Sequence, residues 1–185
     1  FVAHEDIHPT KEWQDEIENA LFSMDAFLAL MNDGFHDSDW TDQEVGVAFG
    51  RGVPIVSFKL GKDPYGFIGK FQALSCSWDA VPKEIVKIFI KHDRMLKAYV
   101  NAVQNCGSFD DGNTLAEILP LVDKLSEEQV NGLVSAYNDN DQVRGSFGFN
   151  GSKPRYHGDG LASHLSRLTG QTYKMLPSGK IKAKS

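Results

Sequence analysis

The chain has 185 residues, a mass of 20.5 kDa and a formal net charge of −6 at pH 7. This length suits one full domain, or one small domain with an addition. Hydrophobic residues make up 41% and charged residues 24%, which is ordinary for a soluble globular protein. No stretch approaches the roughly 18 uninterrupted apolar residues that a membrane span needs. We therefore expect a cytoplasmic protein without a membrane partner.

The distribution of charges and cysteines limits the possible partners. The stretch 142–185 holds eight basic residues and one acidic residue, Asp159, whereas the chain before it is acidic. An acidic body binds nucleic acid poorly, so nucleic acid is not an expected partner, although the basic end could touch phosphate. Cys76 and Cys106 are predicted to be free thiols, because their spacing suits neither a metal site nor a disulfide framework.

The first half of the chain alternates between predicted strands and helices. The runs of strand length carry apolar residues without in–out alternation, which is typical of a parallel sheet covered on both faces. We therefore predict an α/β domain with a small sheet. Strands are expected at 1–4, 26–31, 53–58 and 73–78, and helices at 11–22, 40–49 and 82–104.

The second half, after Gly107, has a different pattern. It predicts short helices at 113–125, 126–137 and 160–168, and a terminal hairpin from 172–175 and 180–182. The glycine-rich segment 145–151 is predicted to be a loop, because it lacks the Gly-Lys-Ser/Thr ending of a phosphate cradle. We therefore expect two domains, 1–106 and 107–185, the second small and mainly helical.

The lysines beside the predicted hairpin leave one alternative open for the second domain. Lys180, Lys182 and Lys184 would contact nucleic acid if this domain were winged-helix-like. That alternative depends on fold analogy alone. The role of the second domain is otherwise not indicated by its sequence.

Trp40 and Glu44 form the most informative pair of residues. In a helix that begins near Ser38, their spacing places the indole and the carboxylate on one face, at the carboxyl end of a buried strand. Open α/β sheets bind ligands at such an edge. The pair suits a substrate with a stacking ring and a developing positive charge. The same residues also fit a surface glutamate favoured by the helix dipole and a tryptophan that anchors the helix.

Several segments resemble, in the right order, a TIR domain of the bacterial type. The similarity covers roughly residues 1–90 and includes the segments 1–7, 12–17, 27–30, 38–46 and 48–56. It implies a small flavodoxin-like parallel sheet. Phe1 aligns with the second strand of the family, so the resemblance implies that the first strand, its loop and its helix lie outside this chain.

The resemblance also implies an activity and its catalytic residue. Many TIR domains are Glu-dependent NAD+ nucleosidases, which cleave the nicotinamide–ribose bond and yield ADP-ribose or a cyclised variant. Glu44 is the Glu of the family's W-x-x-x-E element, and Trp40 would shape the pocket floor. We expect a hydrolase of a bacterial immune or signalling system, such as antiphage defence. NAD+ would be its substrate, with no cofactor and no metal, and self-association its main protein contact.

Two other functions remain as alternatives. Some TIR domains are non-enzymatic modules for protein–protein interaction. A flavodoxin-like receiver or nucleotide-binding domain would share the architecture, but no glycine-rich phosphate loop or acidic metal cluster follows a strand.

Further site residues are implied by position. Trp13 aligns with an aromatic residue that stacks on a ring of the nucleotide in relatives, although it also fits a staple at the helix start. Asn32 ends a strand and is expected to reach ribose or phosphate, and His4 is a candidate for a ligand contact. Asp6 and Ile7 lie in a loop that resembles the family's interaction loop, and a plain surface loop is the alternative.

Overall fold

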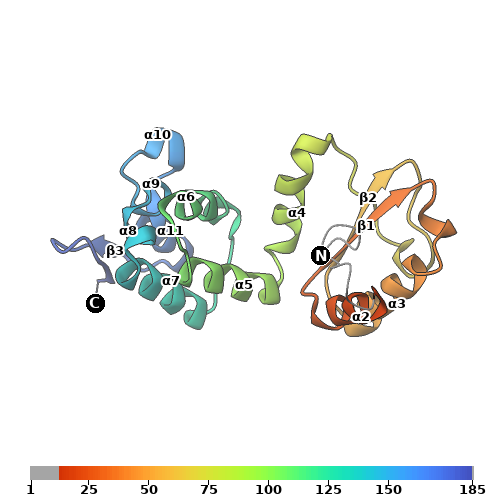
Figure 1. The fold of residues 1–185 in the computed structure, drawn as a ribbon. Coiled ribbons are helices and arrows are strands. Elements are labelled where there is room, and N and C mark those ends of the chain that lie inside the picture. The colour runs from red at the N-terminus through yellow and green to blue at the C-terminus, as the bar shows by residue number, and fades with distance from the viewer. Residues whose placement is uncertain (1–12, 185) are drawn as a thin grey trace. The chain divides into compact units, whose positions relative to one another are not determined.

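The computed structural model describes residues 13–184, and these form two compact units that divide between Phe89 and Ile90. Figure 1 shows the chain passing from one unit to the other after α4 (Val81–Phe89). The expected boundary after Cys106 lies further along the chain. It differs because α5 (Asp93–Gln104) packs against α7 (Glu127–Asp139) and thereby belongs to the second unit.

The first unit is built around a parallel pair of strands. In this pair β1 (Phe27–Asn32) lies beside β2 (Ile55–Leu60), with Phe27 opposite Ile55 and Asn32 opposite Leu60. The helices α2 (Trp13–Ser23) and α3 (Thr41–Arg51) pack on each other, and α3 also contacts β1. The prediction of a mixed α/β unit with parallel strands is therefore confirmed.

The strand predicted at 73–78 is reduced to a single bridge between Phe58 and Leu74. The backbone N–H of Leu74 donates to Ser57 at 2.7 Å, and the N–H of Lys59 donates to Leu74 at 2.9 Å. The pairing stops there because the apolar run ends at Ser75. The strand expected at 1–4 lies outside the described residues.

The long helix predicted at 82–104 is interrupted. Its first part, α4, ends at Phe89, and α5 begins at Asp93 after His92, whose backbone is extended with φ −91° and ψ 132°. The carbonyl of His92 accepts the N–H groups of Met95 and Leu96, so a new helix starts there. Apolar periodicity continues across the break, which is why it predicted one helix where there are two.

Within residues 13–184, four short 3₁₀ helices complete the connections. They are η1 (Phe35–Asp37), η2 (Gly66–Ile68), η3 (Trp78–Ala80) and η4 (Leu119–Leu121). The helix expected at 113–125 is α6 (Phe109–Ala116) followed by η4, where Pro120 occupies an early position. Proline has no N–H to donate within an α-helix, so the α-helix ends before Pro120 and the chain continues as a 3₁₀ helix.

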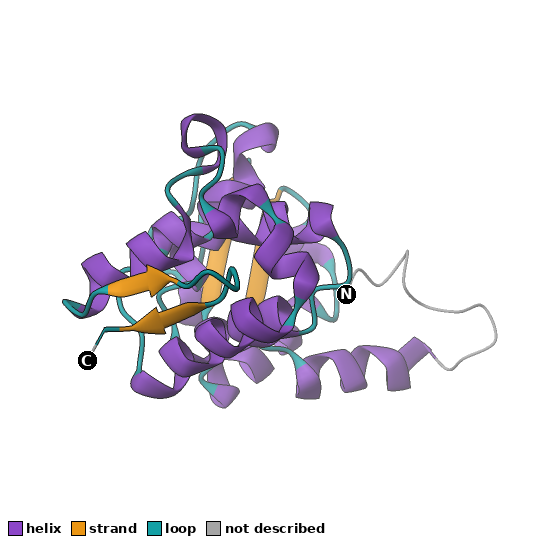
Figure 2. Cartoon of the chain, turned by 90° about the vertical axis from the view of Figure 1, so that its left-hand side faces the viewer, coloured by secondary structure: helices purple, strands orange, loops and turns teal. Residues whose placement is uncertain are grey.

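The second unit is mainly helical and ends in an antiparallel hairpin (Figure 2). The helix predicted at 126–137 is confirmed as α7, which begins with a capping box of Ser126 and Gln129. The remaining elements are α8 (Asp141–Gly145), α9 (Phe147–Asn150), α10 (Pro154–His157), α11 (Gly160–Thr169), β3 (Tyr173–Met175) and β4 (Ile181–Ala183).

The prediction of a loop over 145–151 was wrong, because α9 lies within it. The glycines there serve close packing rather than flexibility. A Cβ on Gly148 would lie 2.3 Å from the Cβ of Ala116, and one on Gly151 would lie 2.6 Å from the carbonyl oxygen of Asp159. Glycine is the residue that permits such an approach.

The two units have cores of different extent. A large cluster in the second unit joins α5, α6, α7, α9, α11 and β4, with Leu133, Leu161 and Leu165 fully buried. The corresponding cluster in the first unit consists of Ala29, Met31, Phe35, Val45 and Ile68. Both cysteines are free, as predicted. Within residues 13–184, no helix combines the length and apolar character needed to cross a bilayer.

Candidate functional site

A cavity of about 620 Å³ lies in the first unit, between α2, β1, the segment after β1 and the first turn of α3. Its volume falls within the roughly 300–1,000 Å³ range of small-molecule sites. Most of its wall is apolar, and four polar side chains interrupt it. The apolar residues include Ile17, Leu21, Leu28, Leu30 and Phe35, and the polar ones are Asn32, Ser38, Thr41 and Glu44.

Glu44 is the ionisable side chain of this wall. It is half-buried, and burial raises the pKa of its carboxyl above the ordinary value of 4.5. Among residues 13–184 its carboxylate has no hydrogen-bonding or ionic partner. An unpaired carboxylate beside apolar surface interacts more strongly with a nearby positive charge than one in water does.

The start of α3 holds Glu44 against the cavity. The backbone N–H of Glu44 donates to the carbonyl of Trp40 at 2.9 Å, which begins the helix. The hydroxyl of Thr41 donates to the carbonyl of Phe35 and so ties the first turn to the segment after β1. Glu44 therefore projects from a fixed turn of helix at the carboxyl end of a parallel strand.

The structure brings Asn32 to the same cavity as Glu44. Asn32 is the last residue of β1 and is exposed, as a residue that contacts a ligand must be. Trp40 is half-buried directly before α3 but does not line the cavity. Trp40 is the N-cap residue of α3, and its carbonyl accepts the N–H of Glu44.

The other predicted site residues are not placed by the structure. Trp13 is the first residue of α2, and its side chain lies outside the described part of the chain. His4, Asp6 and Ile7 fall within residues 1–12, which also lie outside the described residues.

A polar network that the sequence did not suggest lies beside the first turn of α3. The hydroxyl of Tyr65 donates to Oδ1 of Asp42 at 2.7 Å and lies 3.1 Å from Nδ1 of His36. That Nδ1 is also 3.4 Å from Oδ2 of Asp42. Burial and the Asp42 carboxylate raise the pKa of Tyr65 to about 12. The network ties η1, α3 and the residue before η2 together, over separations that carry no local sequence signal.

The described residues 13–184 hold no group of three His, Cys, Asp or Glu side chains placed to bind a metal ion. Comparisons with protein-family models, with curated proteins and with solved structures found no match.

Proposed function

We propose that the first unit is a TIR-type NAD+ nucleosidase, a cytoplasmic enzyme of a bacterial immune or signalling system. The observation that supports this most is the unpaired, half-buried carboxylate of Glu44 in the wall of a cavity of small-molecule size. Glu44 is also the last residue of the W-x-x-x-E element that begins at Trp40. The parallel pair of β1 and β2 is consistent with part of a flavodoxin-like sheet of the TIR type.

The proposed reaction needs little acid catalysis. The bond between C1′ of the ribose and the nicotinamide nitrogen breaks, and its electron pair leaves with nicotinamide, which departs neutral. Positive charge then develops at C1′, and the Glu44 carboxylate would stabilise it electrostatically. Water adds to C1′ and loses a proton to the solvent, which yields ADP-ribose. Attack by a group of the ADP-ribose itself would yield a cyclised product.

The rest of the cavity would serve binding. Leu28 and Leu30 offer apolar surface to the nicotinamide ring, and the Asn32 amide can donate to a ribose hydroxyl or a phosphate oxygen. Exclusion of water by these apolar walls would strengthen the interaction of Glu44 with the developing cation. Self-association of TIR units is part of this proposal, because it would bring further surfaces to the cavity.

The test is the release of nicotinamide from NAD+ by the full chain and by Glu44→Ala. We expect the variant to lose about 10² to 10³ in rate, the range for removal of one electrostatic stabiliser. Asp39→Asn is the matched control, because it removes an exposed carboxylate five residues earlier and should leave the rate unchanged. Rates are measured over a range of protein concentration. Equal turnover by the wild type and Glu44→Ala, or no turnover at any concentration, would contradict the proposal.

A second candidate, a protein-interaction module, is supported by an exposed aromatic cluster. The rings of Phe49 and Phe67 stack with centroids 4.8 Å apart, and Nζ of Lys70 lies over both Phe49 and Phe71. Phe49, Phe67 and Phe71 are 40%, 61% and 49% exposed. Exposed apolar groups gathered in this way mark interaction surfaces. If this is the main function, Phe67→Ser abolishes self-association while Glu44→Ala leaves every measurable property of the assembly unchanged.

A further inference from the structure

The first unit has a second, smaller cavity, which shares Phe35 with the cavity of Glu44. Its volume is about 280 Å³, just below the range of cavities that hold drug-sized molecules, so it suits a small occupant. Three aromatic rings, one carboxylate and two aliphatic side chains line it: Phe35, Tyr65, Phe67, Asp42, Val45 and Ile68. We call it the aromatic pocket.

The core of the first unit fixes much of the wall of the aromatic pocket. Phe35, Val45 and Ile68 are buried in the hydrophobic cluster of this unit. Tyr65 packs against the cluster, and its ring meets that of Phe35 edge to face, with centroids 6.3 Å apart. Gly66, with φ 56°, adds backbone to the wall without a side chain. Because the core holds these groups, binding would need little reorganisation.

The rings around the aromatic pocket already attract an ammonium group nearby. Phe67 stacks on Phe49, so one face of its ring is covered and the rest is exposed. Nζ of Lys70 lies 5.5 Å from the ring centroid of Phe49 and 5.1 Å from that of Phe71, the geometry of a cation–π contact. Lys70 does not line the pocket, so the uncovered part of Phe67 stays available there.

Asp42 gives the aromatic pocket a negative charge. Its Oδ1 accepts the hydroxyl of Tyr65 at 2.7 Å, and its Oδ2 lies 3.4 Å from Nδ1 of His36. Among residues 13–184, no Lys or Arg forms an ion pair with Asp42, and a neutral imidazole leaves its charge intact. The stretch 33–44 contains five acidic residues and no Lys or Arg. The local field therefore favours a cation.

The hydrogen bonds of the wall favour a cation without N–H groups. The carbonyl of Phe35 accepts the hydroxyl of Thr41. The carbonyls of Tyr65 and Gly66 accept backbone N–H groups of η2 and of the residue after it. A primary ammonium would therefore place N–H donors against aromatic rings without an acceptor, which is unfavourable. A quaternary ammonium has no N–H group and is bound well by aromatic faces.

From these features we propose that the aromatic pocket binds a small quaternary ammonium compound, with its charged group against the rings of Tyr65 and Phe67 and close to Asp42. Aromatic side chains arranged around such a cation are a known mode of recognition. The proposal is independent of the proposed nucleosidase, because Glu44 does not line this pocket and the two cavities share one lining residue, Phe35.

The test is an NMR titration of the full chain with choline at constant ionic strength and at pH 8.5, where histidine is neutral. Choline is compared with its uncharged isostere, in which a tert-butyl group replaces the trimethylammonium group. We expect choline to bind about tenfold more tightly and to shift the resonances of Tyr65 and Phe67. Equal affinity of the two compounds would overturn the proposal, because it would indicate an apolar cavity without preference for charge.

Two substitutions separate the carboxylate from the rings. Asp42→Asn keeps an acceptor for the hydroxyl of Tyr65 and should weaken choline binding about fivefold, with no effect on the isostere. Asp39→Asn is its control, an exposed carboxylate outside the pocket. Phe67→Leu should weaken choline binding about threefold, and Phe22→Leu is its control, an exposed phenylalanine outside the pocket. Unchanged choline affinity in Asp42→Asn or in Phe67→Leu would overturn the proposal.

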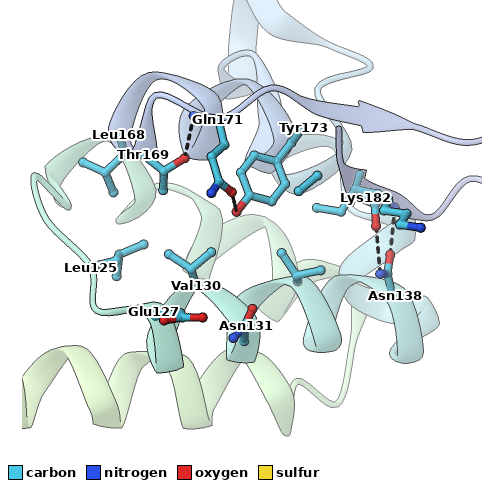
Figure 3. A pocket seen from close by; sticks show the side chains of 13 residues that line it. Leu125, Glu127, Val130, Asn131, Asn138, Leu168, Thr169, Gln171, Tyr173 and Lys182 are labelled. Carbon is cyan, nitrogen blue, oxygen red and sulfur yellow. Dashed lines mark hydrogen bonds between the residues drawn. The ribbon is translucent and has the colours of Figure 1, made fainter. Parts of the chain in front are cut away.

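The second unit provides an internal reference for specificity. Figure 3 shows its cavity of about 590 Å³, between α7, the end of α11 and the hairpin of β3 and β4. Its lining includes one aromatic ring, Tyr173, and two opposite charges, Glu127 and Lys182. Choline should therefore leave the resonances of Tyr173 unchanged at concentrations that saturate the aromatic pocket. Equal shifts at Tyr173 would indicate unspecific binding and would overturn the proposal.

Two further measurements define the ligand and separate the two sites. A short peptide that contains trimethyllysine carries the same charged group on a protein, and a tenfold preference for it over choline would overturn the assignment to a small compound. Glu44→Ala should bind choline as tightly as the wild type, whatever the outcome with NAD+. Loss of choline binding in Glu44→Ala would contradict a separate site.

Discussion

Both units of this chain leave polar groups unpaired among residues 13–184, but they differ in where: the Tyr137 hydroxyl and His164 Nε2 of the second unit are buried, whereas Glu44 of the first unit faces a cavity. In the first unit the half-buried carboxylate of Glu44 lines an open cavity without a partner among residues 13–184. In the second unit Gln129 is buried, but its side chain completes the capping box of α7 and donates to Asp93 at 2.9 Å. An unpaired group costs stability, and such costs are common where a protein binds or reacts.

The two units also differ in the size of their buried hydrophobic clusters. The second unit joins helices from along its length into one large buried cluster, whereas the main cluster of the first unit has five buried residues. Large exposed hydrophobic side chains occur in both units, for example Phe22 in the first and Tyr156 in the second. We infer that the second unit provides most of the stability and that the first carries the chemistry.

Replacing a tightly packed glycine with alanine should lower stability, whereas replacing a loosely packed helical glycine should raise it. Gly148→Ala brings a Cβ to 2.3 Å from the Cβ of Ala116, so we expect the second unit to lose roughly 1–3 kcal/mol by overpacking. Gly46→Ala, inside α3, meets no atom within 4 Å and should stabilise the first unit by roughly 0.5–1 kcal/mol. Thermal unfolding measures both. Equal destabilisation by the two substitutions would show that the units do not differ in packing as described.

Removal of the amide at the end of β1 should affect binding more than chemistry. Asn32→Ala is expected to raise KM for NAD+ about tenfold, the effect of roughly 1.4 kcal/mol, with little change in kcat, because the amide would bind ribose or phosphate in both ground and transition states. Asn19→Ala, an exposed asparagine of α2 outside the cavity wall, is the control. An unchanged KM in Asn32→Ala would remove this residue from the site.

The stability of the two units should respond to pH in opposite directions. Burial raises the pKa of Glu44, so its ionisation destabilises the first unit above that raised pKa and has no such effect below 4.5. Burial lowers the pKa of His164, so the second unit loses stability as pH falls below the ordinary value of 6.5 toward the lowered pKa.

Two substitutions separate these smaller effects. Glu44→Gln should raise the melting temperature at pH 7.5, and the gain should disappear at low pH. His164→Gln should weaken the loss of stability between pH 7 and pH 5. Melting curves with the same pH dependence in the wild type and both variants would contradict the assignment of these groups.

Local sequence patterns predicted which helices and strands form better than they predicted where those helices and strands begin and end. The apolar runs of β1 and β2, the helix after Ser126 and the terminal hairpin all lie close to where the sequence indicated them. The break at His92 and the helix at Phe147–Asn150 were missed. Both depend on tertiary packing: Ile90 enters the core of the second unit, and Gly148 fits closely against Ala116.

The candidate site was predictable only in part for a similar reason. A spacing of four residues indicated that Trp40 and Glu44 share a face, and of the two only Glu44 lines the cavity. The network of His36, Asp42 and Tyr65 joins residues up to 29 positions apart, so no local pattern reveals it. Sequence periodicity reports which residues lie on one face, and contacts between separate segments require the fold.

The measurement that tests the role of the first unit most directly is the pH dependence of nicotinamide release from NAD+ by the full chain. Glu44 must be ionised to stabilise a cation, so we predict that the rate falls on the acid side with a midpoint above 4.5, in line with its raised pKa. Glu44→Gln should be nearly inactive at every pH. An acid limb that persists unchanged in Glu44→Gln, with turnover equal to the wild type, would contradict the role of this carboxylate.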